Sequence, residues 1–282
     1  MPRFASYDGT QLSFRLLGDG PPLVCLPGGP GRAVDYLGDL GGLDAGRQLV
    51  LLDPRGVGAS ADAADPATLR VDRLVQDVES LRSHLGLEQL DLLAHSAGAV
   101  LATLYAATHT DRLARLILVT PGLAAVGVHA TEAQMLAALR RSSAEPWYPT
   151  ASAALEKIMA GDLSIDAYRA SRPFFYGRWG EAARAHATVG IAARHRAARD
   201  GYFAGLDLDL PATRVALARL TAPVLLYGGE MDPMVMPALL EQAAPAFPDA
   251  TVVVQPAAAH FPWVDDAAAF SAAVSAFVGS AT

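Results

Sequence analysis

The most constraining feature of this sequence is the segment LDLLAHSAGAV at residues 90–100. An apolar run of strand length ends at Ser96 between small residues, and a stretch with helical character follows from Val100. This layout is typical of a nucleophile elbow, a tight strand-to-helix turn that presents a serine hydroxyl above a sheet. The pattern G-x-S-x-G is met here as A-x-S-x-G, with Ala94 at the first small position. The alternative interpretation is a plain strand-to-helix junction that contains an incidental serine.

Length and composition limit the classes of function. The 282 residues are 52% hydrophobic and 18% charged, enough for one large domain with an inserted segment. A formal net charge of −7 without a basic run argues against a nucleic-acid partner. No apolar stretch approaches the roughly 20 residues that span a bilayer, and no signal-peptide pattern begins the chain. We therefore expect no membrane partner and a cytoplasmic location. Cys25, the single cysteine, excludes an intrachain disulfide.

Strand-like apolar segments alternate with helical ones along most of the chain. The strand-like segments lie at residues 23–26, 48–52, 90–95, 116–119, 224–227 and 251–254. With a hairpin signal at Asp8-Gly9 and a helical period over 69–85, they predict an α/β fold with a mostly parallel central sheet flanked by helices. The strand rhythm disappears between 123 and 214, which predicts an inserted helical cap. The expected division is a core over 1–122, the cap over 123–214, and the remainder of the core over 215–282.

A serine nucleophile needs a base, and the base needs an acid to orient it. In folds with this elbow the order along the chain is serine, acid, histidine. Asp232 and His260 each follow a predicted strand, at the strand end where such sheets place their sites. We therefore predict Ser96 as nucleophile, His260 as general base and Asp232 as the residue that orients it. Glu230 is a second candidate for the acid, while His95, beside the serine, is expected to be a packing residue.

The glycine-rich segment PGGPG at 27–31 follows the first buried strand. Glycines leave backbone N–H groups accessible to an oxyanion. We expect the N–H of Gly29, or of Gly28 if the register is shifted by one, to act together with the N–H of Ala97. An ordinary glycine-proline turn is the alternative. The segment lacks the lysine of a phosphate-binding loop and the glycine spacing of a dinucleotide site, and no metal-ligand cluster is evident, so neither a cofactor nor a metal is expected.

Taken together, five motifs resemble the proline iminopeptidase (prolyl aminopeptidase) branch of the α/β-hydrolases. They are PGGPG at 27–31, DPRGVGAS at 53–60, the Ser96 elbow, GEMD at 229–232 and AHF at 259–261. That branch carries H-G-G-P-G, D-x-R-G-x-G-x-S and G-x-S-x-G. The resemblance implies an α/β-hydrolase fold with an inserted cap and the same triad and oxyanion donors. It also implies that Asp53 and Arg55 form a structural pair beside the site.

Three positions depart from the motifs of that branch. Pro27 stands in place of histidine, Ala94 in place of glycine, and Ala97 in place of a tryptophan common after the peptidase serine. Without that tryptophan the case for strict proline specificity is weaker. In the family, carboxylates of the cap capture the free amine of the substrate, and the candidates here are Glu181 and Glu145. Either glutamate is equally compatible with a solvated helix position.

The predicted cap also holds aromatic residues close to these glutamates. Trp147 and Trp179 are expected to line an acyl pocket, or else to pack within the cap. The leading hypothesis is a serine hydrolase that acts as an aminopeptidase or amidohydrolase on a small-molecule or short peptide-like substrate. An esterase, lactonase or thioesterase with the same triad is the closest alternative, and a non-catalytic ligand-binding protein of this fold is the third. A cap carboxylate that binds ammonium favours the peptidase, and an apolar cap favours the esterase. The sequence leaves the oligomeric state open.

Overall fold

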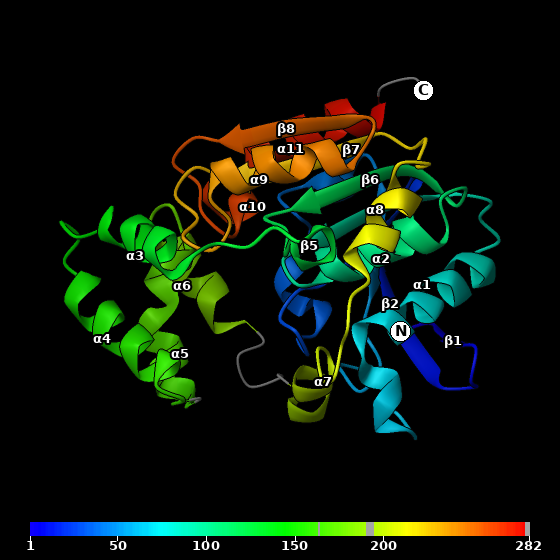
Figure 1. The fold of residues 1–282 in the computed structure, drawn as a ribbon, viewed down its shortest axis with the longest axis horizontal. Coiled ribbons are helices and arrows are strands. Elements are labelled where there is room, and N and C mark those ends of the chain that lie inside the picture. The colour runs from blue at the N-terminus through cyan, green and yellow to red at the C-terminus, as the bar shows by residue number, and fades with distance from the viewer. Residues whose placement is uncertain (163, 190–194, 280–282) are drawn as a thin grey trace.

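The centre of the molecule is an eight-stranded sheet in the order β1-β2-β4-β3-β5-β6-β7-β8 (Figure 1). This computed structural model describes residues 1–162, 164–189 and 195–279. The strands are β1 (Arg3–Ala5), β2 (Gln11–Leu17), β3 (Pro22–Leu26), β4 (Gln48–Leu52), β5 (Leu90–His95), β6 (Leu113–Val119), β7 (Val224–Gly229) and β8 (Ala250–Gln255). Only the pairs β1–β2 and β2–β4 among these strands are antiparallel. The predicted mostly parallel sheet and the hairpin at Asp8-Gly9 are confirmed.

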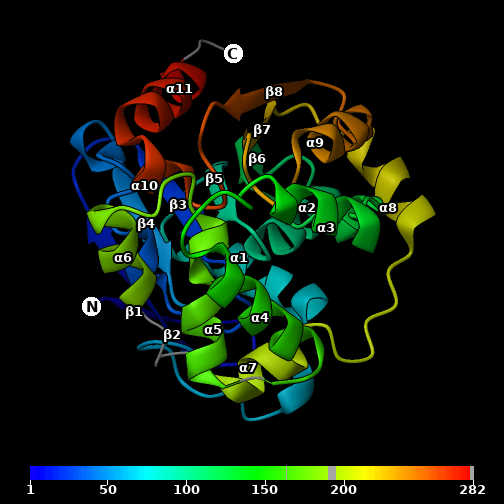
Figure 2. The same cartoon turned by 90° about the vertical axis from the view of Figure 1, so that its left-hand side faces the viewer.

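Helices cover both faces of this sheet and one of its ends. They are α1 (Val71–His84), α2 (Gly98–Thr108), α3 (Glu132–Arg140), α4 (Tyr148–Met159), α5 (Ile165–Ser171), α6 (Glu181–Thr188), α7 (Arg196–Gly201), α8 (Leu210–Leu217), α9 (Pro237–Ala243), α10 (Pro262–Asp265) and α11 (Ala267–Gly279). Short 3-10 helices are η1 (Val34–Leu37), η2 (Leu43–Ala45), η3 (Pro66–Leu69), η4 (Ala124–Val126), η5 (Arg172–Phe175) and η6 (Ala244–Ala246). Figure 2 shows α11 on one side of the sheet and α8 and α9 on the other.

The central strands are apolar in consecutive residues because both faces of the sheet are buried. In β3, Val24 belongs to the core on the α1 and α2 side, while Leu23 and Cys25 belong to the core on the α11 side. The same alternation divides Leu92 from Leu93 in β5. Each strand therefore contributes to two hydrophobic layers, which holds its carboxyl end in a fixed position.

Most helices of the segment between β6 and β7 lie at the carboxyl end of the sheet. In Figure 1 the arrowheads of β6 and β8 point toward the group α3 to α6. Helix α8 is different, because its Leu217 is fully buried in the same core as α1 and α2, although α8 begins inside the range 123–214 expected for the cap. The boundaries at 123 and 214 stay a prediction. None of the helices in the described ranges combines the length and the hydrophobicity needed to cross a bilayer.

Asp53 and Arg55 do not pair with each other, so that expectation is wrong. The Asp53 carboxylate is fully buried and accepts hydrogen bonds from two backbone N–H groups, including that of Val34 at 3.1 Å. Arg55 instead contacts two other carboxylates, with its Nε 2.8 Å from Asp77 Oδ2 and its Nη1 2.6 Å from Asp8 Oδ2. Both residues are structural, but each holds a different part of the chain.

Candidate active site

Ser96 occupies the turn between β5 and α2 with a φ of +54°, a value that few non-glycine residues adopt. The turn brings two other segments very close. A Cβ on Gly98 would lie 2.4 Å from the carbonyl oxygen of Pro27, and a Cβ on Gly28 would lie 2.7 Å from the Cβ of Ser96. These approaches explain why small residues surround the serine. Ala94 precedes the turn inside β5, where its methyl group is fully buried.

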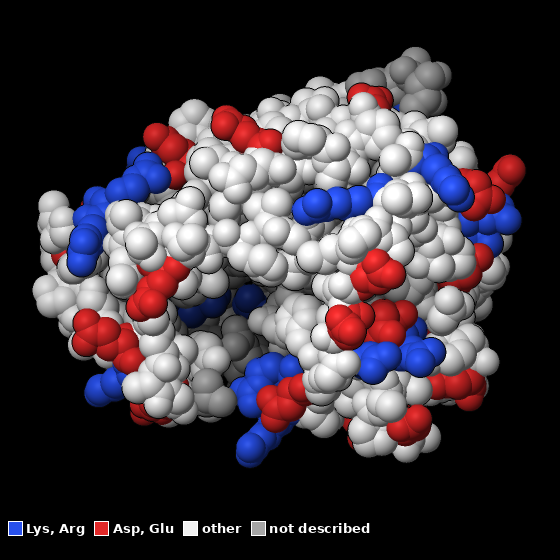
Figure 3. Space-filling view, viewed as in Figure 1, with Lys and Arg blue, Asp and Glu red and all other residues white. Residues whose placement is uncertain are grey.

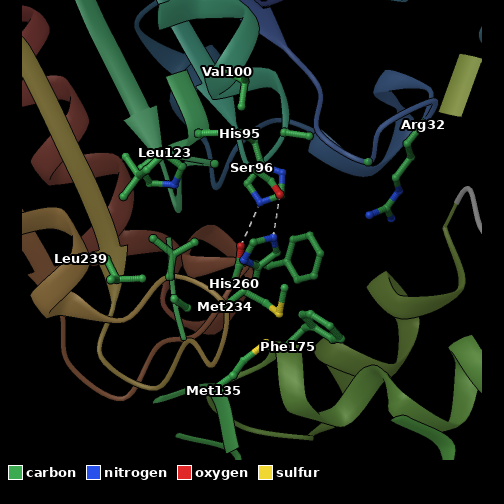
Figure 4. Close-up of a pocket in the computed structure, with 18 of the residues that line it drawn as sticks. Arg32, His95, Ser96, Val100, Leu123, Met135, Phe175, Met234, Leu239 and His260 are labelled. Carbon is green, nitrogen blue, oxygen red and sulfur yellow. Dashed lines mark hydrogen bonds between the residues drawn. The ribbon is translucent and has the colours of Figure 1, made fainter. Parts of the chain in front are cut away.

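The three predicted residues Ser96, His260 and Asp232 come together at the carboxyl ends of β5, β8 and β7. His260 Nε2 lies 3.0 Å from Ser96 Oγ, and His260 Nδ1 lies 2.8 Å from Asp232 Oδ2. Figure 4 shows the first of these contacts as a dashed line. His260 is 8% exposed and Asp232 fully buried. The imidazole therefore contacts the serine with one nitrogen and the carboxylate with the other.

The carboxylate of Asp232 is held by the loop that follows β7. Its second oxygen, Oδ1, accepts hydrogen bonds from the backbone N–H groups of Met234 at 2.8 Å and Val235 at 3.2 Å. Glu230, the competing acid, is exposed and its carboxylate accepts a hydrogen bond from the backbone N–H of Ala257. Of the two acids, Asp232 is the one that contacts His260.

His95 holds the backbone of His260, a contact that the sequence did not reveal. His95 Nε2–H donates to the carbonyl oxygen of His260 at 2.9 Å, and Thr120 donates to the same oxygen at 3.1 Å. His95 Nδ1 accepts a hydrogen bond from the Tyr36 hydroxyl at 2.8 Å. Burial holds the pKa of His95 well below its usual value, so the ring is neutral. The only signal in the sequence was its position beside Ser96.

Gly29 and Ala97 line the same cavity as Ser96. The neighbouring Gly28 donates its N–H to the hydroxyl of Tyr36 at 2.6 Å. That hydrogen bond occupies the N–H of Gly28, which leaves Gly29 as the better-placed of the two predicted glycines.

The cavity beside Ser96 has a volume of about 570 Å³. Its lining is largely apolar and comes both from the core and from the helices at the end of the sheet. Figure 4 shows Val100, Leu123, Met135, Phe175, Met234 and Leu239 around Ser96 and His260. A volume of this size suits a small ligand with an apolar part.

The charged residues of the cavity lining are two arginines, Arg32 and Arg172, and among the described residues that line it there is no aspartate or glutamate. Both arginines are nearly buried, with exposed fractions of 4% and 7%. Figure 3 shows a hollow in this face of the molecule with blue Lys or Arg atoms deep inside it. The side chain of Arg32 extends toward the region of Ser96 and His260 in Figure 4. The cavity is therefore electropositive.

The residues expected to bind substrate are placed elsewhere. Glu145, Trp147 and Trp179 line a second cavity of about 530 Å³, and Glu181 is an exposed residue in the first turn of α6. Trp147 packs edge-on against Phe174, with ring centroids 5.1 Å apart. Trp179 packs against Tyr176, with ring centroids 5.5 Å apart. None of these four residues lines the cavity beside Ser96, so this geometry does not support their contact with a substrate there. In the described part of the chain, no group of side chains is suited to hold a metal ion.

Comparison with known proteins identifies the family. A family model described as alpha/beta hydrolase fold matches residues 21–267. The chain belongs to the alpha/beta hydrolase fold family. Among curated proteins, it is 33% identical over 125 residues to a proline iminopeptidase from Heyndrickxia coagulans, an alignment that spans 43% of each protein. It is 27% identical to a proline iminopeptidase from Levilactobacillus brevis over 96% of this chain and 93% of that one. The predicted resemblance to the proline iminopeptidase branch is confirmed.

Some of these curated relatives are matched over less than half of their own length. The chain spans 43% of the Heyndrickxia coagulans protein and 37% of a proline iminopeptidase from Clostridioides difficile. The activity in the names of these relatives is therefore a hypothesis for this chain.

Solved structures of esterases share the fold. The esterase RhEst1 from Rhodococcus superposes with a TM-score of 0.75 at 23% identity, covering 99% of this chain and 98% of that one. An esterase from Exiguobacterium antarcticum superposes with a TM-score of 0.74 at 19% identity, covering 99% of both chains. The fold of this chain therefore has relatives named as peptidases and structural neighbours named as esterases.

Proposed function

We propose that this protein is a serine hydrolase that transfers an acyl group to water through Ser96, His260 and Asp232. The observation that carries the proposal is the continuous hydrogen-bonded chain from Ser96 Oγ through both imidazole nitrogens to a buried carboxylate. A neutral imidazole with its Nδ1–H held by a carboxylate presents Nε2 as the base that accepts the serine proton.

In the proposed reaction, Ser96 Oγ attacks the substrate carbonyl carbon while its proton moves to His260 Nε2. The backbone N–H groups of Gly29 and Ala97 stabilise the negative charge on the carbonyl oxygen. The bond to the leaving group then breaks, and His260 returns the proton to the departing oxygen or nitrogen. A water molecule, deprotonated by His260 in the same way, attacks the acyl-enzyme and releases the carboxylic acid and free Ser96.

The cavity lining favours a small ester as the substrate. Capture of a free amine requires a carboxylate, and the described residues that line the cavity include none. The aminopeptidase hypothesis remains the second candidate, because the curated relatives are named proline iminopeptidase. A lactone or thioester is compatible with the same triad.

A substrate panel separates these candidates. Aminoacyl-4-nitroanilides with free and blocked amines are compared with 4-nitrophenyl acyl esters, using the wild type and Ser96→Ala. Hydrolysis of esters that is lost in Ser96→Ala supports the proposal, and preferential hydrolysis of free-amine anilides supports the aminopeptidase. A wild type that hydrolyses neither and that a fluorophosphonate probe does not label at Ser96 would indicate a non-catalytic binding protein.

A further inference from the structure

We propose that the cavity beside Ser96 selects a substrate that carries a carboxylate group, and that Arg172 and Arg32 bind this group. The inference rests on the proposed hydrolase function and adds to it the charge of the substrate. This protein would then bind a negatively charged group of its substrate, whereas capture of a substrate amine involves a positively charged group.

Arg172 is the first observation. This residue begins η5, lines the cavity and is 7% exposed. Its Nη2 donates to the Tyr176 hydroxyl at 3.3 Å, while its buried Nε has no hydrogen-bond partner within the described chain. No carboxylate of the described residues forms an ion pair with it, and the residues outside the described ranges include no aspartate or glutamate. A buried cation of this kind is costly unless an anion joins it.

Two arginines outside this cavity, the buried Arg55 and the partly buried Arg115, are paired with carboxylates. Arg55, 1% exposed, contacts the carboxylates of Asp77 and Asp8. Arg115 forms an ion pair with Asp91. Arg172 differs from both because its neighbours are aromatic rings and a hydroxyl. The rings of Phe261 and Phe175, for example, have centroids 5.2 and 5.6 Å from its Cζ.

Arg32 places a second positive charge on the same cavity. Its guanidinium lies over the ring of Tyr36, with Cζ 3.6 Å from the centroid, and Nη2 donates to the carbonyl oxygen of Val189 at 2.9 Å. Its Cζ is also 5.8 Å from the centroid of Phe261, the ring that Arg172 approaches from 5.2 Å. Phe261 directly follows His260, and both of these residues line the same cavity as the two arginines.

The positive charge of the cavity is local, because the whole chain carries a formal net charge of −7. At physiological ionic strength, solvent-exposed charges more than about 8 Å away are largely screened, so the acidic residues of the surface contribute little to the field at the cavity. A guanidinium donates parallel hydrogen bonds that match the two oxygens of a carboxylate. The apolar side chains of the lining suit the hydrocarbon part of such a substrate.

Matched ester pairs test this proposal. Mono-4-nitrophenyl glutarate and 4-nitrophenyl valerate differ only by a carboxylate in place of the terminal methyl group of the acyl chain. 4-Acetoxybenzoate and 4-tolyl acetate place the same difference in the leaving group. The measured quantity is the ratio of kcat/KM for the anionic ester to kcat/KM for the neutral ester of the same pair. In at least one of the two pairs, we expect this ratio to fall at least tenfold in Arg172→Gln and to recover partly in Arg172→Lys.

Arg178→Gln is the matched control, since Arg178 lies six residues away and lines the second cavity. This variant should leave the ratio unchanged. If Arg172→Gln leaves the ratio of both pairs unchanged while Ser96-dependent hydrolysis of the neutral esters persists, the carboxylate inference is wrong and the hydrolase proposal stands.

If no ester is hydrolysed in a Ser96-dependent manner, the hydrolase proposal fails and binding tests the anion site directly. Glutarate titrated into the wild type by calorimetry should then bind, with an affinity at least tenfold weaker in Arg172→Gln than in Arg178→Gln. Absence of glutarate binding to the wild type would overturn the inference in that case.

Discussion

At the scale of single residues, the environment of His260 is fixed from three directions. Asp232 holds its Nδ1, Ser96 faces its Nε2, and His95 donates to its carbonyl oxygen. His95 and Ser96 are consecutive residues at the end of β5, and Asp232 comes from the loop after β7. The three contacts involve different atoms of His260, so single substitutions can test each contact separately.

Asp232→Asn should lower kcat for ester hydrolysis at least 1000-fold, because an amide neither stabilises the imidazolium nor holds the required tautomer. Steady-state kinetics on 4-nitrophenyl esters measures the loss, and circular dichroism verifies the fold. Glu230→Gln is the control and should retain full activity, since Glu230 is exposed and contacts the backbone of Ala257. Greater loss in Glu230→Gln than in Asp232→Asn would reverse the assignment.

Tyr36→Phe should lower the free energy of unfolding by about 1–3 kcal/mol, because it leaves the buried N–H of Gly28 and Nδ1 of His95 without their shared partner. Urea denaturation measures this change. Tyr7→Phe removes a hydroxyl from a side chain that is 48% exposed and should have almost no effect. Equal stability of the two variants would contradict the importance of the Tyr36 contact.

At the scale of elements, the turn between β5 and α2 depends on close contact with the loop after β3. A side chain at Gly98 meets the backbone of Pro27, which cannot move without displacing the segment that contains Gly29. A small residue at position 98 therefore allows the backbone of the turn to lie against the backbone of the loop after β3. Alanine is tolerated at position 94, two residues before Ser96, because that residue is still within β5.

Gly98→Ala should destabilise the protein by about 1–3 kcal/mol and lower kcat, since its methyl group would lie 2.4 Å from the carbonyl oxygen of Pro27. Thermal or urea unfolding combined with ester kinetics measures both effects. Gly46→Ala is the matched control, because a Cβ at Gly46 meets no atom within 4 Å and its φ of −130° suits alanine. A Gly98→Ala variant as stable as Gly46→Ala would show that the turn relaxes easily.

At the scale of the whole molecule, His186 joins α6 to the core beside the cavity. His186 Nε2–H donates to the carbonyl oxygen of Tyr36 at 2.7 Å, and Nδ1 accepts from the Tyr176 hydroxyl at 2.8 Å. Burial and the nearby charges of Arg32 and Arg172 lower the pKa of His186 to about 4, although the hydrogen bond to Tyr36 opposes this shift. The ring is therefore neutral above about pH 4 in the folded chain, and Nδ1 can accept from the Tyr176 hydroxyl only in this neutral form.

The contribution of His186 to the free energy of unfolding should consequently fall as the pH drops from about 6.5 toward 4. The unfolded chain binds a proton at His186 in this range and the folded chain does not, so the free energy of unfolding loses up to about 1.4 kcal/mol per pH unit from this residue. Denaturation of wild type and His186→Gln across this range measures the contribution, and the variant should show the shallower dependence. Identical slopes for the two proteins would mean that His186 titrates alike in the folded and unfolded chains.

The sequence by itself determined the features that local chemistry enforces. Buried strands of a parallel sheet must be apolar in consecutive residues, so β3 to β7 were visible as runs such as that before Ser96. Parallel strands also bring their carboxyl ends to one edge, which is why Ser96, Asp232 and His260 could be grouped from their order and from the strands that precede them.

The tertiary structure alone decided what depends on contacts between distant segments. Arg55 meets Asp77 and Asp8 instead of Asp53, because the packing of α1 and the first hairpin brings those carboxylates to it. Helical periodicity gave no information on how α3 to α6 turn their side chains. That arrangement leaves Glu145 outside the cavity beside Ser96 and buries Arg172 in its wall, so the charge offered to a substrate is a property of the assembled cap.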